Sequence, residues 1–176
     1  VVLSSLAILF FLPLILIIML ILKFTGEGEI FFFQKRVGKK GKIIKLFKFV
    51  TMLKDSEKIG TGTVTIKNDP RVLPFGKFLR FSKINELPQL FNILKGELTF
   101  IGPRPALYNQ EDLIQLRTQK KIHMLIPGIT GWAQVNGRDR LTISEKVEMD
   151  YYYLNNNSFW IDIKIMWLTL VKVFRS

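Results

Sequence analysis

The chain has 176 residues, and its 26 Lys and Arg residues outnumber its 14 Asp and Glu residues to give a net charge of +12. This length allows one compact domain with a hydrophobic appendage, and the positive charge predicts an anionic partner such as nucleic acid, anionic lipid or a phosphorylated substrate. The absence of cysteine excludes disulfides, thiolate catalysis and zinc-thiolate sites, and with His123 as the only histidine it leaves a hard ion held by carboxylates, Mg²⁺ above all, as the expected metal.

The first segment is apolar. Residues 1–22 contain no charged side chain, and Lys23 ends the run. A helix of roughly 20 residues can cross a bilayer, whereas a cleaved signal peptide would have a basic start and a small-residue cleavage site. Pro13 removes one backbone hydrogen bond and favours a kink, so both a re-entrant helix and a straight spanning helix stay open. We predict a membrane helix over residues 1–23, kinked at Pro13, followed by a separate domain over residues 24–176.

The next segment is basic. Between residues 30 and 54 the charged residues are all cationic: Lys35, Arg36, Lys39, Lys40, Lys42, Lys45, Lys48 and Lys54. Positive charge beside a membrane segment marks the cytoplasmic side and attracts anionic headgroups. This pattern predicts a domain on the cytoplasmic face of the membrane, with membrane lipid as a partner. A basic hairpin that is merely solvated is the alternative.

A β-hairpin is predicted first in this domain. Residues 30–37 and 42–51 are rich in Phe, Ile and Val, and residues 38–41 between them supply two glycines for a turn. Residues 55–70 are polar and contain Gly60 and Gly62, which predicts a long loop of the kind that often carries function.

Helical periodicity follows the loop. We predict helices over residues 76–81, 86–94, 109–121, 144–154 and 160–174, separated by Gly- and Pro-containing loops at residues 99–105 and 127–140. No internal repeat or low-complexity tract is present. The predicted fold class is therefore α+β and mostly helical, with a short hairpin.

The last predicted helix is amphipathic. One face holds large apolar side chains at helical spacing, and the other is more polar: Trp160, Ile163, Trp167, Val171 and Phe174 against Asp162, Thr169 and Lys172. Tryptophan at successive turns is typical of a helix at a membrane interface. Packing as an ordinary core helix is the equal alternative.

Residues 83–105 hold the first candidate for chemistry. Asn85 is a good N-cap, Glu86 suits the positive end of a helix, and Pro88 fits a first turn. Further along, Arg104 lies between Pro103 and Pro105 in a stiff loop, and arginine is suited to bidentate phosphate binding. If Arg104 faces Glu86, a carboxylate and a cation converge as phosphoryl transfer requires.

A second candidate lies at residues 127–138. Three glycines accompany Gln134, Asn136 and Arg138, side chains that can bind a sugar, a uracil edge or a phosphate. A structural turn with Trp132 in the core is the alternative. Glu148 and Asp150 are possible further carboxylates, although a solvated helix face gives the same spacing.

Taken together, the motifs resemble the bacterial sugar transferase family, the monotopic polyprenyl-phosphate phosphoglycosyl transferases. The resemblance covers nearly the whole chain through motifs in the family's order: the Pro-containing apolar segment, then residues 48–52, 86–90, 102–105, 127–138 and 150–152. Several independent motifs in one order are highly specific.

The resemblance implies a reaction and a location. The family transfers a sugar 1-phosphate from a UDP-sugar to undecaprenyl phosphate, releasing UMP with Mg²⁺ as cofactor, to begin surface glycan synthesis such as O-antigen, capsule or exopolysaccharide at the inner membrane. It implies a catalytic pair at Asn85 and Glu86, with the metal on Glu86. By motif position it also implies substrate contacts by Arg80, Arg104, Gln134, Asn136 and Arg138, and downstream glycosyltransferases as possible partners.

Two positions depart from the family pattern. Asn85 occupies the place of the nucleophilic Asp, and Leu12 occupies the place of a Ser before the helix-breaking proline. Because an amide is a poor nucleophile, Glu86 could attack phosphorus, the polyprenyl phosphate could attack directly, or the protein could be a catalytically silent scaffold. A basic nucleic-acid-binding membrane protein is a rival of another class, but the apolar segment and the lack of a nucleic-acid module argue against nucleic acid as a partner.

Overall fold

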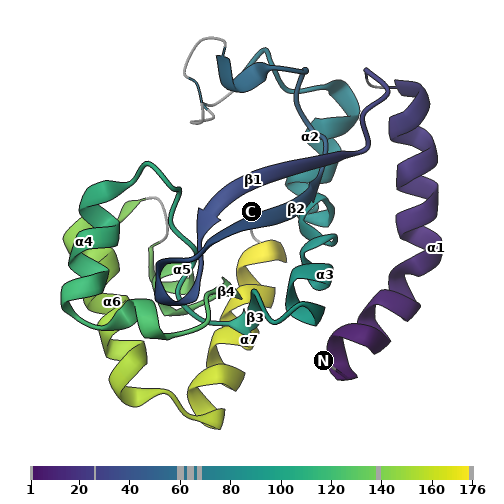
Figure 1. The fold of residues 1–176 in the computed structure, drawn as a ribbon. Coiled ribbons are helices and arrows are strands. Elements are labelled where there is room, and N and C mark those ends of the chain that lie inside the picture. The colour runs from purple at the N-terminus through teal and green to yellow at the C-terminus, as the bar shows by residue number, and fades with distance from the viewer. Residues whose placement is uncertain are drawn as a thin grey trace. The chain divides into compact units, whose positions relative to one another are not determined.

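The computed structural model describes residues 2–25, 27–58, 62, 66, 69–137 and 140–174, and all structural statements below refer to these residues. The predicted α+β, mostly helical fold is confirmed (Figure 1). The helices are α1 (Val2–Thr25), α2 (Pro74–Phe81), α3 (Gln89–Leu94), α4 (Glu111–Gln119), α5 (Trp132–Asn136), α6 (Ile143–Asn156) and α7 (Phe159–Phe174). The strands are β1 (Phe31–Val37), β2 (Ile43–Phe49), β3 (Thr99–Ile101) and β4 (Gly128–Thr130), and the 3₁₀ turns are η1 (Lys39–Gly41), η2 (Ser56–Lys58), η3 (Ile84–Glu86) and η4 (Ile122–Met124).

The predicted hairpin is present as β1 and β2. Its turn closes with a hydrogen bond from the Gly38 amide to the Lys42 carbonyl at 2.7 Å. Lys40 and Gly41 adopt positive φ angles of 56° and 75° there, and glycine reaches this region without steric cost. Sequence composition therefore located both strands and their turn.

A second sheet lies where loops were predicted. β3 and β4 form a parallel pair in which Thr99 is opposite Gly128 and Ile101 is opposite Thr130. The prediction of loops over residues 99–105 and 127–140 is thus wrong at both strands, and also at α5. Each strand has only three residues, too few for side-chain alternation to be visible beside the glycines and prolines around them.

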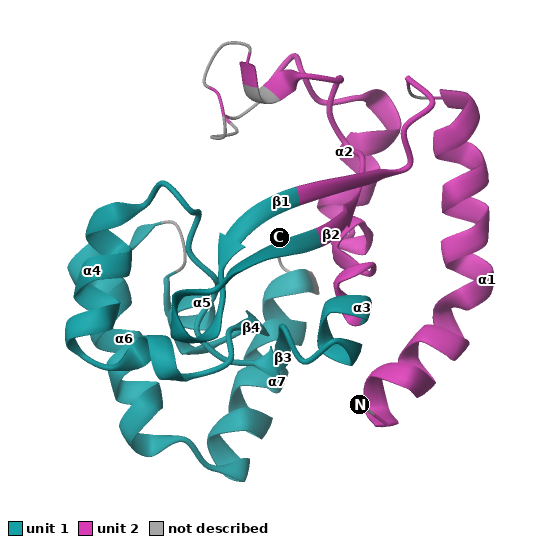
Figure 2. Cartoon of the chain, viewed as in Figure 1, with its two compact units in different colours: residues 1, 34–46, 91–176 teal, residues 2–33, 47–90 magenta. Residues whose placement is uncertain are grey.

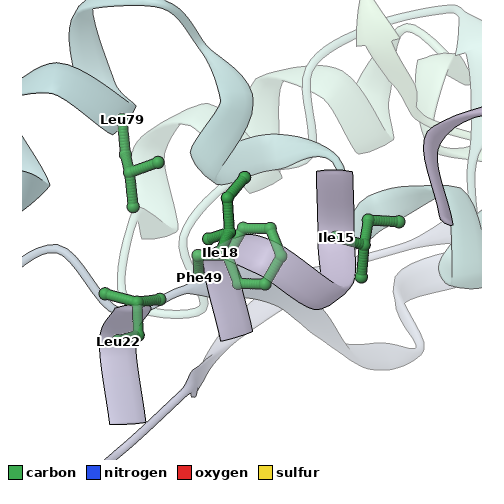
Figure 3. Close-up of a cluster of buried hydrophobic side chains, with 5 residues drawn as sticks. All are labelled: Ile15, Ile18, Leu22, Phe49 and Leu79. Carbon is green, nitrogen blue, oxygen red and sulfur yellow. The ribbon is translucent and has the colours of Figure 1, made fainter. Parts of the chain in front are cut away.

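The chain divides into two compact units, shown in different colours in Figure 2. Unit 2 comprises residues 2–33 and 47–90 and contains α1 and α2. Its core places Ile15, Ile18 and Leu22 of α1 against Phe49 and Leu79 (Figure 3). One side of α1 is therefore fixed by packing within this unit.

The rest of α1 is exposed. The helix includes Pro13 without interruption, and its axis bends along its length (Figure 1). It is long and apolar enough to cross a membrane by length and composition, and 17% of its most apolar window is buried within the protein. A helix apolar around its circumference with so little burial agrees with the predicted contact with lipid.

Unit 1 comprises residues 34–46 and 91–176 and has two apolar clusters. One cluster contains Leu113 of α4, Ile122 of η4 and Val147 of α6. The other contains Val135, Tyr153 and Ile165. α6 begins with a capping box, in which the Thr142 hydroxyl accepts from the Glu145 amide and the Glu145 carboxylate accepts from the Thr142 amide. These elements support the loops described below.

The last helix, α7, packs as a core helix along one side, and its predicted place at a membrane interface stays a prediction. Ile165 is fully buried in the second cluster of unit 1, and the Thr169 hydroxyl lies 2.8 Å from that of Thr130 on β4. On the other side, Trp160 and Trp167 are 77% and 65% exposed. α7 therefore packs with one face against the rest of unit 1, and its tryptophan side chains lie exposed on another face.

Candidate active site

Glu86 and Asn85 lie in η3, which shortens the helix predicted from residue 86. Asn85 is not an N-cap: Glu86 and Leu87 donate to the carbonyls of Lys83 and Ile84 at 3.0 Å, an i to i+3 pattern, and α3 begins only after Pro88. The chain enters this turn through Lys83, whose φ is 59°. The candidate catalytic pair thus stands on a tight, half-buried turn and not on the first turn of a helix.

Two cations accompany Glu86 within unit 2. The Nζ atom of Lys48, on β2, lies 3.8 Å from Oε1 of Glu86, with both side chains largely buried. Burial lowers the pKa of the Arg80 guanidinium on α2, an effect opposed by the charges of Asp69 and Glu86 and reinforced by Arg71. We call Lys48, Arg80 and Glu86 the Glu86 cluster; it can hold an anion beside a carboxylate.

Asp69 and Arg71 form a buried ion pair next to this cluster. Arg71 donates through Nε to Oδ1 at 2.9 Å and through Nη2 to Oδ2 at 2.6 Å, and its Nη1 donates to the carbonyls of Ser56 and Gly62. The Arg71 side chain holds the pKa of Asp69 well below its ordinary value. This pair fastens the loop predicted at residues 55–70 to the start of α2; most of residues 59–68 lie outside the described part of the chain.

The carboxylates fit a Mg²⁺ site only in a minimal form. No cluster of three acidic, His or Cys side chains exists among the described residues. The carboxylate of Asp69 is bound by Arg71. Glu86, which pairs with Lys48, is the carboxylate of the Glu86 cluster. Mg²⁺ is commonly held by one or two carboxylates together with substrate phosphates and water, so Glu86 fits a site that the phosphates of a substrate would complete.

In unit 1, the two glycine-containing motifs lie against each other. The Gly102 amide donates to the Thr130 carbonyl at 2.8 Å, and the Gly128 amide donates to the Pro103 carbonyl at 3.0 Å. A Cβ atom on Gly131 would approach the Gly102 carbonyl oxygen to 2.1 Å, so only glycine permits this approach. Residues 102–105 and 127–131 are therefore one structural feature, although they are far apart in sequence.

Beside this feature lies a cavity of about 260 Å³, which we call the Arg104 cavity. Two predicted site residues, Arg104 and Gln134, line it together. Three further cations, Arg36, Arg117 and Lys146, also line it. Both amide atoms of the Gln134 side chain are buried and have no hydrogen-bond partner among the described residues.

Two arginines hold the backbone of the Gly102–Pro105 segment at this cavity. Arg117 donates through Nη1 to the Arg104 carbonyl at 2.8 Å, and Arg36 donates to the Pro105 carbonyl at 3.0 Å. Arg117 also pairs with Asp150, whose pKa is raised by burial against the opposing charge of Arg117. Asp150 therefore has a defined structural position and is not on a solvated helix face.

The remaining predicted residues are placed differently. Asn136 is exposed, and its amide donates to the Trp132 carbonyl within α5. Arg138 lies outside the described residues. Glu148 is exposed in an ion pair with Lys120, as expected for a solvated helix face. Because the two units are described separately, the prediction that Arg104 faces Glu86 stays a prediction.

Sequence reasoning missed Arg117, Lys146 and the pairing role of Arg71. Arg117 is the single cation within the α4 pattern, and a helical arginine normally signals a solvated face. Asp69 and Arg71 are two residues apart around Pro70, a spacing that could have suggested a local ion pair. No local signal distinguishes Lys146 from the other lysines of the chain.

Comparison with known proteins identifies relatives along the whole chain. The family model described as Bacterial sugar transferase matches residues 1–176. An uncharacterized sugar transferase of Bacillus subtilis, EpsL, is 39% identical over 93% of this chain and 79% of its own length. A UDP-glucose:undecaprenyl-phosphate glucose-1-phosphate transferase of Escherichia coli is 41% identical over 99% of this chain, and a UDP-N-acetylgalactosamine-undecaprenyl-phosphate N-acetylgalactosaminephosphotransferase of Aeromonas hydrophila is 37% identical over 95%. The chain spans 39% and 40% of the lengths of these last two proteins.

Proposed function

The chain belongs to the bacterial sugar transferase family, as its motifs predicted, and we propose that it is a phosphoglycosyl transferase that moves a sugar 1-phosphate from a UDP-sugar to undecaprenyl phosphate. The products are a sugar-diphospho-undecaprenol and UMP. The names of the relatives support this reaction class. We place the reaction at the cytoplasmic face of the inner membrane, where it would begin the synthesis of a surface glycan.

The Arg104 cavity is the observation that carries the proposal. Its lining combines Arg104 and Gln134, which come from two motifs joined by the β3–β4 pairing, with further cations on α4 and α6. A cavity with several cations and a polar amide suits a ligand that has phosphate and a hydrogen-bonding ring. A nucleotide sugar has both groups.

The Glu86 cluster has the groups needed to stabilise the phosphoryl group during its transfer. Lys48 and Arg80 can stabilise negative charge on a transferring phosphoryl group, and Glu86 can bind Mg²⁺. Bound Mg²⁺ would neutralise charge on the diphosphate of the donor. The remaining task is to supply the attacking oxygen.

The bond changes are the same by either open route. An oxygen bonds to the β-phosphorus of the UDP-sugar, the bond from that phosphorus to the bridging oxygen breaks, and UMP leaves with the electron pair. In a direct route the oxygen belongs to undecaprenyl phosphate. In a two-step route Glu86 attacks first, and the acceptor phosphate then displaces it. Asn85 is the nucleophile in neither route, because its side-chain amide is a poor nucleophile.

The silent scaffold is the second candidate, favoured specifically by Asn85. Purified protein in lipid nanodiscs, with undecaprenyl phosphate, Mg²⁺ and a panel of UDP-sugars, separates the two functions by UMP release. We expect release from at least one sugar, dependent on Mg²⁺ and on the acceptor. If no sugar in the panel gives release, the transferase proposal fails and the scaffold stands.

The assay uses a panel of UDP-sugars because the proposal does not specify which sugar the donor carries. The relatives are named for different sugars, among them glucose and N-acetylgalactosamine. A sugar is distinguished by hydrogen bonds to its hydroxyl and acetamido groups. We therefore propose the reaction class and leave the donor sugar to the assay.

A further inference from the structure

A polar side chain near the Glu86 cluster is buried with an unsatisfied donor. Gln89, the first residue of α3, is 2% exposed, and its Nε2 atom is buried with no hydrogen-bond partner among the described residues. An N–H group that is removed from water and left unbonded has a free-energy cost, and native proteins rarely keep one unless a further group completes it. The Gln89 amide therefore needs an acceptor that the described residues do not supply in this arrangement.

A second buried amide in the same helix shows what a purely structural role requires. Asn92 lies three residues further along α3 and is fully buried. Its Nδ2 atom donates to the Lys45 carbonyl at 2.8 Å and to the Glu97 carboxylate at 2.6 Å. The fold thus satisfies a buried amide in α3 where the amide holds the chain together. The Nε2 atom of Gln89 has no such contact in the described part of the chain, which indicates a different role.

The backbone places Gln89 on the same face of its turn as Glu86. Glu86, Leu87 and Leu90 each donate at 3.0 Å to the carbonyl three residues before them, and Leu87 has helical φ and ψ angles of -52° and -40°. In a turn with this hydrogen-bond pattern, side chains three residues apart are eclipsed. Gln89 follows Glu86 by three residues in the same unit, so its side chain leaves the backbone on the side of the carboxylate, one turn further on.

The Glu86 carboxylate is suited to accept from this amide. A carboxylate has about four acceptor sites. The 3.8 Å between its Oε1 atom and Nζ of Lys48 is the distance of an ion pair and is too long for a hydrogen bond. Pro88, which lies between Glu86 and Gln89, has no backbone N–H to donate. The Gln89 amide is therefore the side-chain donor that this turn presents to Glu86.

We propose that Gln89 is a positioning residue for Glu86, and that its amide donates to the carboxylate when a phosphate group of the substrate draws Lys48 towards itself. This inference rests on the proposed function and deepens it. The lysine charge sits on a flexible stem, so a bound phosphate competes with Glu86 for it. Gln89 then keeps the carboxylate in place and oriented, which both metal binding and attack on phosphorus by Glu86 require.

A buried water is the rival partner for the same amide. Water would satisfy the Nε2 atom without involving Glu86, and Gln89 would then have a structural role alone. The alternatives differ in one measurable respect. Only a bond to Glu86 makes the effect of changing Gln89 depend on the presence of the Glu86 carboxylate.

Calorimetric titration of the full chain in detergent with UDP and Mg²⁺ tests this dependence. UDP is the probe because it carries the β-phosphate that all UDP-sugars share. Gln89→Met replaces the amide with an apolar side chain of similar length, and it should weaken UDP binding by about tenfold. In a Glu86→Ala background the same change should have no effect on UDP binding, because the acceptor is gone. A loss of equal size in both backgrounds would overturn the inference.

Thermal unfolding separates the positioning role from a structural one. Gln89→Met removes a buried donor without a partner, so it should not lower the unfolding temperature. Asn92→Leu, in the same helix, removes two hydrogen bonds and should lower it. Gln115→Met makes the matched change at an exposed residue and should alter neither unfolding nor UDP binding. Equal losses of stability in Gln89→Met and Asn92→Leu would assign the Gln89 amide to folding alone and contradict the inference.

The same preparations are assayed for UMP release, so that this inference and the proposed function can fail separately. Gln89→Met should lower the rate of release by about tenfold. Release at the wild-type rate in this variant removes the positioning role and keeps the transferase. A Gln89 effect on UDP binding that depends on Glu86, without release from any UDP-sugar, keeps the contact between the two residues and removes the transferase.

Discussion

Arg117 donates two hydrogen bonds to one oxygen of Asp150, from Nε at 3.0 Å and from Nη2 at 2.5 Å. The third bond of the guanidinium group, to the Arg104 carbonyl at 2.8 Å, links this buried pair to the Gly102–Pro105 segment. Asp150 begins the Asp150-Tyr151-Tyr152 motif, and Arg104 belongs to another motif. Arg117 therefore links two motifs that are far apart in the sequence.

We predict that Asp150→Ala lowers the free energy of unfolding by about 3 to 5 kcal/mol, since it leaves the Arg117 charge buried without its partner. The double change Asp150→Leu with Arg117→Met should cost less than Asp150→Ala, because no buried charge remains. Urea unfolding of the full chain in detergent measures both. Glu148→Ala, which removes a partly exposed ion pair on the same helix, is the control and should cost less than about 1 kcal/mol. A larger cost for the double change than for Asp150→Ala would show that the unpaired charge of Arg117 is not what destabilises the single variant.

Asp69 and Asp150 should give opposite pH dependences of stability. The hydrogen bonds from Arg71 lower the pKa of Asp69, so its stabilisation is present above the ordinary value of 3.8 and is lost as the pH falls through the lowered native value. Burial raises the pKa of Asp150, so the free energy of unfolding declines as the pH rises from 3.8 through the raised native value.

Each aspartate therefore has its own diagnostic substitution. Asp150→Asn should remove the decline above 3.8, and Asp69→Asn should remove the loss on acidification. Urea midpoints measured from about pH 3 to about pH 7 check both. Identical pH profiles for the wild type and the two variants would show that neither carboxyl is linked to folding in this way.

The elements that the sequence predicted are those specified locally. The hairpin was found because apolar strands flank a turn with glycines, and α6 was found because helical periodicity runs through residues 144–154, close to its bounds at Ile143 and Asn156. The parallel pairing of β3 with β4 was missed because it depends on close approach of Gly102, Gly128 and Gly131, which in sequence indicate only loops. Composition describes neighbours along the chain and not neighbours in space.

The candidate site shows the same division. Arg104 and Gln134 were predicted from residue chemistry and resemblance, and the structure places both on one cavity. Asn85 was predicted to cap a helix because the residue type is suited to that position, yet i to i+3 hydrogen bonds form there. Arg117 was missed because its importance comes from burial against Asp150, which depends on how α4 packs on α6.

Glu86→Gln should reduce UMP release by about a hundredfold or more, because it removes the carboxylate that we propose to bind Mg²⁺ or to attack phosphorus. The protein should stay folded and membrane-bound, which distinguishes a chemical loss from a structural one. Glu111→Gln changes an exposed residue of α4 in the same way and should retain full activity. Retained activity in Glu86→Gln would remove Glu86 from the site.

Asn85→Asp tests the attacking group. If an acid at this position acts as a nucleophile, the variant incubated with a UDP-sugar labelled in its β-phosphate should carry label on the protein, because a carboxylate can form an acyl phosphate and an amide cannot. We expect no stable label at residue 85 in the wild type. Label on the wild-type protein that disappears in Glu86→Gln would instead assign the two-step route to Glu86.

The aromatic face of α7 should lie in the membrane interface. Trp160 and Trp167 are exposed on this face, whereas Trp132 is half-buried and stacks on Tyr152 with ring centroids 5.6 Å apart. Tryptophan is favoured at the headgroup level of a bilayer. In nanodiscs with brominated phospholipids, tryptophan emission of the wild type should be strongly quenched.

The variant with Trp160→Phe and Trp167→Phe retains only Trp132 and should show little quenching. This contrast separates α7 from α1, which contains no tryptophan and would keep every variant on the membrane. Equal quenching in the wild type and the variant would mean that Trp132, and not α7, reports the lipid. Absence of quenching in both would place α7 in water, where an exposed face with two tryptophans would need a protein partner to cover it.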